Sequence, residues 1–135
     1  MKCRSVIAGM CKINLKLTRM MVSKFVEHAT SQSWGFSYTD KIGSCCEQIY
    51  SDVQDSEIRA EVIYCALEVG KSHNRWSVMS TFDSLMYAPK LPGEPAVIAK
   101  KLNEASSDLR EWAAERLMQG RLDENISAVL WPPLF

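Results

Sequence analysis

The sequence predicts an all-α fold of about six to seven helices packed as antiparallel hairpins. Three observations predict this class. Apolar side chains recur at steps of three and four along most of the chain, and capping residues, glycines and prolines separate these segments. No alternation of apolar and polar residues indicates a strand. The 135 residues, of which 47% are hydrophobic and 24% charged, are typical of one globular domain spanning 1–135.

The first predicted helix extends from Ile13 to about residue 30. Its apolar residues form a broad stripe: Ile13, Leu15, Leu17, Met20, Met21, Phe25 and Val26. We expect residues 1–11 to form an extended or poorly ordered basic arm. The segment 31–37 is expected to be a loop with aromatic anchors, and Asp40 is expected to cap a second helix over 41–51.

The clearest helix follows Asp55, whose carboxylate suits an N-cap, and Gly70 is expected to end it. The next helix is expected over 76–87. A proline-rich break follows, because proline lacks an amide donor and clashes with a preceding helical turn. Of the last three predicted helices, the first begins at Pro95. The second begins after Ser106 or Ser107 and ends at Gly120. The third begins near Asp123 and is stopped by Pro132 and Pro133.

Two of these helices share a pattern centred on Arg59 and Arg110. In each, a capping residue precedes the arginine by four positions, and small or aliphatic residues follow it by three and four. The stretches 55–67 and 106–117 resemble the second-helix signature of HEAT-like repeats. The resemblance implies a short layer of stacked helical hairpins, and an irregular helical bundle is the alternative.

Charge is unevenly distributed, although 16 basic and 16 acidic residues give a net charge of zero. The first 26 residues contain six basic residues and no acid. One interpretation is that this helix binds nucleic acid through the phosphates, with Lys12, Lys16, Arg19 and Lys24 as contacts. The other interpretation is that the basic helix lies on the acidic body of its own chain.

The five cysteines do not form a pattern typical of disulfides or of zinc sites, since their number is odd and Cys45 and Cys46 are adjacent. We expect reduced thiols, a cytoplasmic location, and core positions for Cys65 and for one of the adjacent pair. No catalytic constellation, glycine-rich phosphate loop or cofactor motif is present, so we expect no cofactor and no metal. No apolar run is long enough to span a bilayer, and no membrane partner is expected.

These observations favour a non-catalytic protein-binding module, such as an adaptor, an inhibitor or an immunity-type protein. Its partner would be a protein with a basic surface, and a homo-oligomer is compatible with the sequence. The candidate contact residues are one acidic pair on a helix and three aromatic anchors: Glu57, Glu61, Trp34, Trp131 and Phe135. The alternative for the aromatic residues is that they plug the ends of the core.

Overall fold

The computed structural model describes residues 9–31 and 33–118, and the described chain is all-α, as predicted. A short helical turn over residues 9–13 precedes six longer helices. Their bounds are α2 Leu15–Ser31, α3 Phe36–Asp52, α4 Ser56–Ser72, α5 Trp76–Tyr87, α6 Glu94–Asn103 and α7 Ser107–Met118. Within these described ranges no strand occurs.

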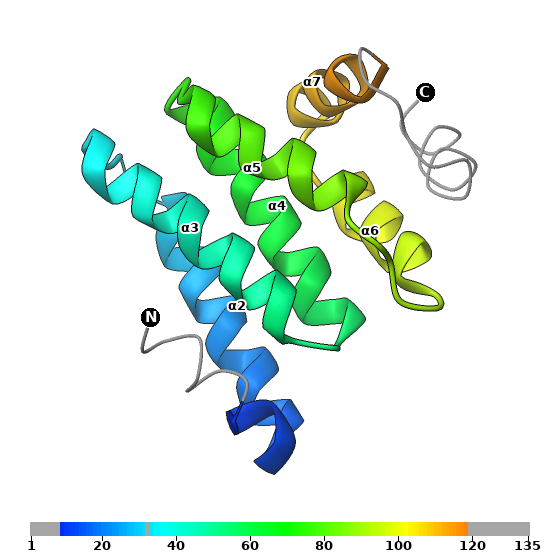
Figure 1. Ribbon diagram of the computed structural model, residues 1–135. Helices are drawn as coiled ribbons and strands as arrows, with labels where there is room; N and C mark the ends of the chain where they lie inside the picture. Colours follow the sequence, from blue (N-terminus) through cyan, green and yellow to red (C-terminus); the bar gives the residue numbers. More distant parts are fainter. Residues whose placement is uncertain (1–8, 32, 119–135) are drawn as a thin grey trace.

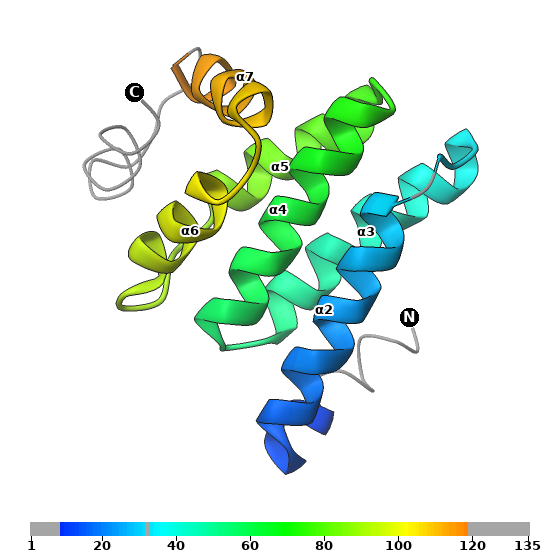
Figure 2. The same cartoon turned by 180° about the vertical axis from the view of Figure 1, so that it is seen from behind.

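The helices alternate between two layers. Figure 1 shows α3 and α5 side by side on the near side of the molecule, and Figure 2 shows α2, α4 and α6 in front when the molecule is seen from behind. Helix α4 contacts α2 and α6 within its own layer, α3 and α5 in the other layer, and α7 at one end. It is therefore the central helix of the fold.

The core is built around α4, in which ten residues are buried: Ile58, Arg59, Ala60, Val62, Ile63, Cys65, Ala66, Leu67, Val69 and Gly70. Phe82 of α5 and Ile98 of α6 are fully buried against it. Cys46 and Cys65 are both 0% exposed, which confirms the prediction that thiols fill the core. A hydrogen bond with the neighbouring Cys65 thiol, together with burial, raises the pKa of Cys46 well above its usual range, so this thiol stays protonated.

Three of the predicted capping and proline signals are confirmed. Asp55 caps α4, because its carboxylate accepts a hydrogen bond from the Ile58 amide at 3.1 Å. Ser106 Oγ accepts one from the Leu109 amide at 3.3 Å at the start of α7. Pro95 lies in the first turn of α6, where its missing amide costs nothing. The predicted helix over 123–130 and the stop at Gly120 lie outside the described residues.

Two predicted helix boundaries are wrong. Helix α3 begins at Phe36 with Gly35 as its N-cap, so Asp40 lies inside the helix. Asp40 accepts hydrogen bonds from Arg75 at 2.9 and 3.0 Å and from Ser77 at 2.6 Å, and these contacts lower its pKa to about 2. The sequence predicted that Gly70 ends the central helix, but α4 continues through Gly70 to Ser72.

The predicted apolar stripe of the first helix is confirmed only in part: Val26 is buried and Phe25 packs against the core. Helix α2 buries Thr18, Val22, Val26 and Ala29, whereas the larger side chains Leu17, Met20 and Met21 are 45%, 56% and 44% exposed. The Thr18 hydroxyl donates to the Asn14 carbonyl at 2.8 Å, so its polar group is satisfied when it is buried. Residues 9–11 of the predicted extended arm are helical, and residues 1–8 lie outside the described chain.

Alanine at Gly43 and at Gly70 is expected to change stability in opposite directions. A Cβ atom on Gly43 would meet Thr81 Oγ1 and Val78 Cγ2 at 3.4 Å, so Gly43→Ala keeps the packing. The better helix propensity of alanine should then stabilise the protein by about 0.5–1 kcal/mol. A Cβ atom on Gly70 would lie 3.2 Å from the backbone nitrogen of Met79, so α5 must shift.

We expect Gly70→Ala to lower the free energy of unfolding by about 1 kcal/mol, since overpacking outweighs the gain in helix propensity. Urea unfolding of both variants measures the difference. Equal stabilisation of the two variants would show that α5 moves away from α4 at little cost.

Candidate functional site

The surface of α4 that faces away from the core is a narrow stripe between α2 and α6. It consists of Glu57, Glu61, Tyr64 and Glu68, which share one face of the helix at steps of three and four. The predicted pair Glu57 and Glu61 thus lies together, in the layer that Figure 2 brings to the front. This face is acidic because three of its four residues are glutamates.

A groove lies on each side of this stripe. The α2–α4 groove has a volume of about 240 Å³ and is lined by Arg19, Met20, Ser23, Glu57, Ile58 and Glu61. The α4–α6 groove has a volume of about 340 Å³ and is lined by Glu57, Ala60, Glu61, Val97, Lys100, Lys101 and Glu104. Both glutamates line both grooves, so the two hollows form one continuous surface, which we name the groove face.

The two glutamates differ in how accessible they are. Glu61 Oε1 accepts a hydrogen bond from Lys101 Nζ at 2.8 Å, and its side chain is 23% exposed. Lys101 also lies 5.1 Å from the centre of the Tyr64 ring. Glu57 is 63% exposed, and its nearest charged neighbour is Arg19, whose Nε lies 3.5 Å from Glu57 Oε2. Glu57 is therefore the carboxylate that a partner could reach at the centre of the groove face.

Arg19 is held by an acid of its own chain. Its guanidinium donates to both Asp55 oxygens, at 2.6 and 3.1 Å, and this fork joins α2 to the start of α4. Burial opposes ionisation of Asp55, but the hydrogen bonds from Arg19 and from the Ile58 amide outweigh it and lower the Asp55 pKa. At this position the structure supports the interpretation of a basic helix lying on its own acidic body.

The other predicted phosphate contacts remain on the surface. Lys12, Lys16 and Lys24 are exposed, and Lys24 lies 3.7 Å from Glu27. Asn14 interrupts the helix between Lys12 and Lys16, and its side chain accepts a hydrogen bond from the Leu17 amide at 3.0 Å. Lys12 therefore does not lie on the same continuous helix as Lys16, Arg19 and Lys24.

Trp34 is half-buried and packs against the core cluster. Its indole N–H donates to the Ala29 carbonyl at 2.9 Å, and its amide donates to His73 Nε2, also at 2.9 Å. The Tyr38 ring stacks on it with 5.5 Å between the ring centres. These contacts support the interpretation of Trp34 as a plug that joins the ends of α2 and α4. Trp131 and Phe135 lie outside the described residues.

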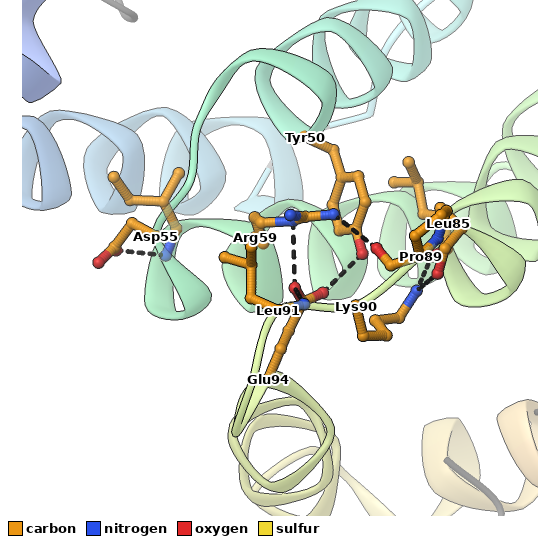
Figure 3. A network of polar contacts seen from close by, with 10 residues as sticks. Tyr50, Asp55, Arg59, Leu85, Pro89, Lys90, Leu91 and Glu94 are labelled. Atoms are coloured by element: carbon orange, nitrogen blue, oxygen red, sulfur yellow. Dashed lines mark hydrogen bonds and ion pairs between the residues drawn. The ribbon is translucent and has the colours of Figure 1, made fainter. Parts of the chain in front are cut away.

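Figure 3 shows a buried polar network that the sequence did not predict. The side chains of Arg59 and Glu94 are 7% and 0% exposed, and Arg59 Nε lies 3.2 Å from Glu94 Oε1. The Tyr50 hydroxyl donates to Glu94 Oε2 at 2.5 Å, and the Leu91 amide donates to Oε1 at 2.9 Å. Arg59 Nη2 donates to the Pro89 carbonyl at 3.0 Å. The network ties the loop between α5 and α6 to the central helix.

A hollow of about 360 Å³ opens beside this network and is lined by Tyr50, Ser51, Gln54, Arg59, Ala88, Pro89, Lys90 and Leu91. Lys90 donates to the Leu85 and Ala88 carbonyls at the end of α5, which is a stabilising position for a cation. Burial and the bond to Glu94 raise the pKa of Tyr50, so its hydroxyl stays protonated. These contacts within the chain explain the charged residues of the network as structural.

No protein-family model, curated protein or solved structure matches this chain. Within residues 9–31 and 33–118, no group of three histidine, cysteine, aspartate or glutamate side chains is placed to hold a metal ion. None of the described helices has the length and apolar character needed to cross a membrane.

Proposed function

We propose that the chain is a non-catalytic protein-binding module, of the adaptor, inhibitor or immunity type, that binds its partner on the groove face. One observation carries the proposal: Glu57, 63% exposed, stands where the two grooves meet. Met20, 56% exposed, lines the α2–α4 groove and offers an apolar contact beside this charge. A central charge next to an apolar contact is typical of protein interfaces.

The partner that fits is a protein with a basic side chain to pair with Glu57 and an apolar side chain to contact Met20. The alternation of helices in two layers supports a short HEAT-like layer as the scaffold, since such layers bind partners along one face. Four cysteines of the described chain are free thiols, which supports a cytoplasmic location.

Reversing the charge at Glu57 is expected to weaken partner capture about tenfold or more, because the new lysine repels a basic partner. Affinity capture from a lysate of the native host compares the full chain with Glu57→Lys. Glu47→Lys is the matched control, since Glu47 is an exposed acid on α3, in the other layer. The same protein captured by the full chain and by Glu47→Lys, but lost with Glu57→Lys, is the expected result.

A chain shortened by residues 131–135 forms a second arm of this experiment, since the apolar tail with Trp131 and Phe135 is the other predicted anchor. Loss of the partner on truncation alone, with Glu57→Lys unaffected, would transfer the binding function to the tail. Equal capture by all four chains would contradict both surfaces.

A further inference from the structure

Helix α2 has a second apolar face that the described part of the chain leaves partly exposed. Leu17 and Met21, one turn apart, are 45% and 44% exposed, on a side of α2 away from buried Val22 and Val26. Ile13, in the preceding helical turn, is 88% exposed. An edge helix of a helical layer usually carries polar residues on its free side, because exposed apolar residues there promote association. This side of α2 is therefore suited to bind another molecule or a lipid surface.

The charge around these residues is net positive, since Lys16 and Lys24 outnumber Glu27. Lys16 and Lys24 are exposed beside Leu17 and Met21, and Lys24 has only a surface pair at 3.7 Å with Glu27. Such a pair contributes little, because both side chains are more than 70% exposed to solvent. We name Lys16, Leu17, Met21 and Lys24 the outer α2 face, and Ile13 precedes it in the helical turn before Asn14. The outer α2 face combines apolar side chains with lysines, as surface-binding amphipathic helices do.

Three occupants can be compared by their chemistry. A second copy packed on the same face would cover the apolar side chains but would bring lysines against lysines. Nucleic acid would match the lysines through its phosphates but would offer Leu17 and Met21 no apolar contact. The interface of an anionic lipid bilayer matches both, since the apolar side chains enter the acyl boundary while the lysines reach the lipid phosphates.

We propose that the outer α2 face docks the protein on the surface of an anionic lipid bilayer. This inference is independent of the proposed protein-binding function, which rests on Glu57 and the grooves. The prediction of no membrane partner rested on the absence of a membrane-spanning run, and a helix that lies on the surface needs none. Binding by one short apolar face and a few lysines should be reversible and sensitive to salt.

Co-sedimentation of the full chain with lipid vesicles tests the proposal. Vesicles of equal parts phosphatidylcholine and phosphatidylglycerol should bind the protein at low salt, and pure phosphatidylcholine vesicles should bind it far less. Lys16→Gln/Lys24→Gln should lower the affinity about tenfold or more, since each lysine near an anionic surface contributes about fivefold. Leu17→Gln/Met21→Gln should also lower it about tenfold or more, because two apolar side chains no longer leave water.

Matched controls lie elsewhere on the surface. Lys41→Gln/Lys71→Gln removes the same charge from exposed sites on α3 and α4, and Trp76→Gln removes a side chain that is 73% exposed on α5. Both controls should bind vesicles as the unaltered chain does. Circular dichroism melting should show that all variants fold, since exposed substitutions rarely change stability by more than about 0.5 kcal/mol.

Several outcomes would overturn the proposal. Absence of binding to anionic vesicles at low salt is one. Unchanged vesicle binding by Leu17→Gln/Met21→Gln would also overturn it, since binding by charge alone would equally suit nucleic acid. If this variant also bound duplex DNA, the face would be assigned to nucleic acid. Sedimentation of the lipid-free protein as a dimer, made monomeric by Leu17→Gln/Met21→Gln, would assign the face to a second copy.

Discussion

Glu94→Gln is expected to lower the free energy of unfolding by about 3–5 kcal/mol, the range found when one partner of a buried ion pair is removed. Arg59 keeps its charge in the variant, but its side chain is 7% exposed and loses the carboxylate with which it forms its ion pair. The hollow beside Arg59 gives its guanidinium some access to water, which places the expected loss toward the lower end of this range. Urea unfolding followed by circular dichroism measures the effect.

Glu104→Gln is the matched control, because Glu104 is an exposed acid just after α6 and should change stability by no more than about 0.5 kcal/mol. Adding Arg59→Met to Glu94→Gln should recover part of the loss, since the double variant no longer buries an unpaired charge. A loss below about 1 kcal/mol for Glu94→Gln would show that water replaces the carboxylate.

Asp55→Ala is expected to cost about 2 kcal/mol, since it removes the cap of α4 and the fork with Arg19 together. Asp55→Asn separates the two contributions. Asparagine caps a helix as well as aspartate does but carries no charge for Arg19, so we expect a loss of about 1 kcal/mol. Equal losses for the two variants would show that the cap contributes nothing measurable.

The contribution of Asp55 should also depend on pH in a defined direction. Its pKa in the folded protein lies below the value of an ordinary aspartate, so the unfolded chain binds the proton more tightly. The stabilisation is therefore complete above the unfolded pKa and is lost as the pH falls through the folded pKa. The stability difference between the unaltered chain and Asp55→Asn should accordingly shrink in acid.

The sequence predicted features that depend on neighbouring residues. Asp55 as a cap, Pro95 in a first helical turn and the break before it each follow from backbone hydrogen bonding within a few positions. Cys65 as a core residue follows from its place on the most apolar helical face. Local chemistry of this kind holds in almost any tertiary setting, which explains why these predictions succeed.

Features that join distant segments were not predictable in the same way. Aspartate is a common N-cap residue, but the Asp40 carboxylate instead accepts a hydrogen bond from Arg75, which lies 35 positions away in the sequence. Helix α2 has two apolar faces, and periodicity does not show which of them meets α4; the smaller side chains of Thr18 and Val22 face the core. The grooves beside Glu57 depend on the approach of α2 and α6 to α4, which spacing in the sequence does not specify.

The central position of α4 affects how the molecule comes apart. Every other helix from α2 to α7 packs against α4, whereas α3 and α5 also pack against each other, so most of the shared interior depends on α4. A long array of repeats, in which each unit contacts only its neighbours, can unfold one end unit at a time. This chain should instead unfold in one cooperative transition, because its helices share the central helix α4. Fraying should be confined to α2 and α6, the edge helices of the layer that contains α4, because the packing of the other helices on α4 does not require them.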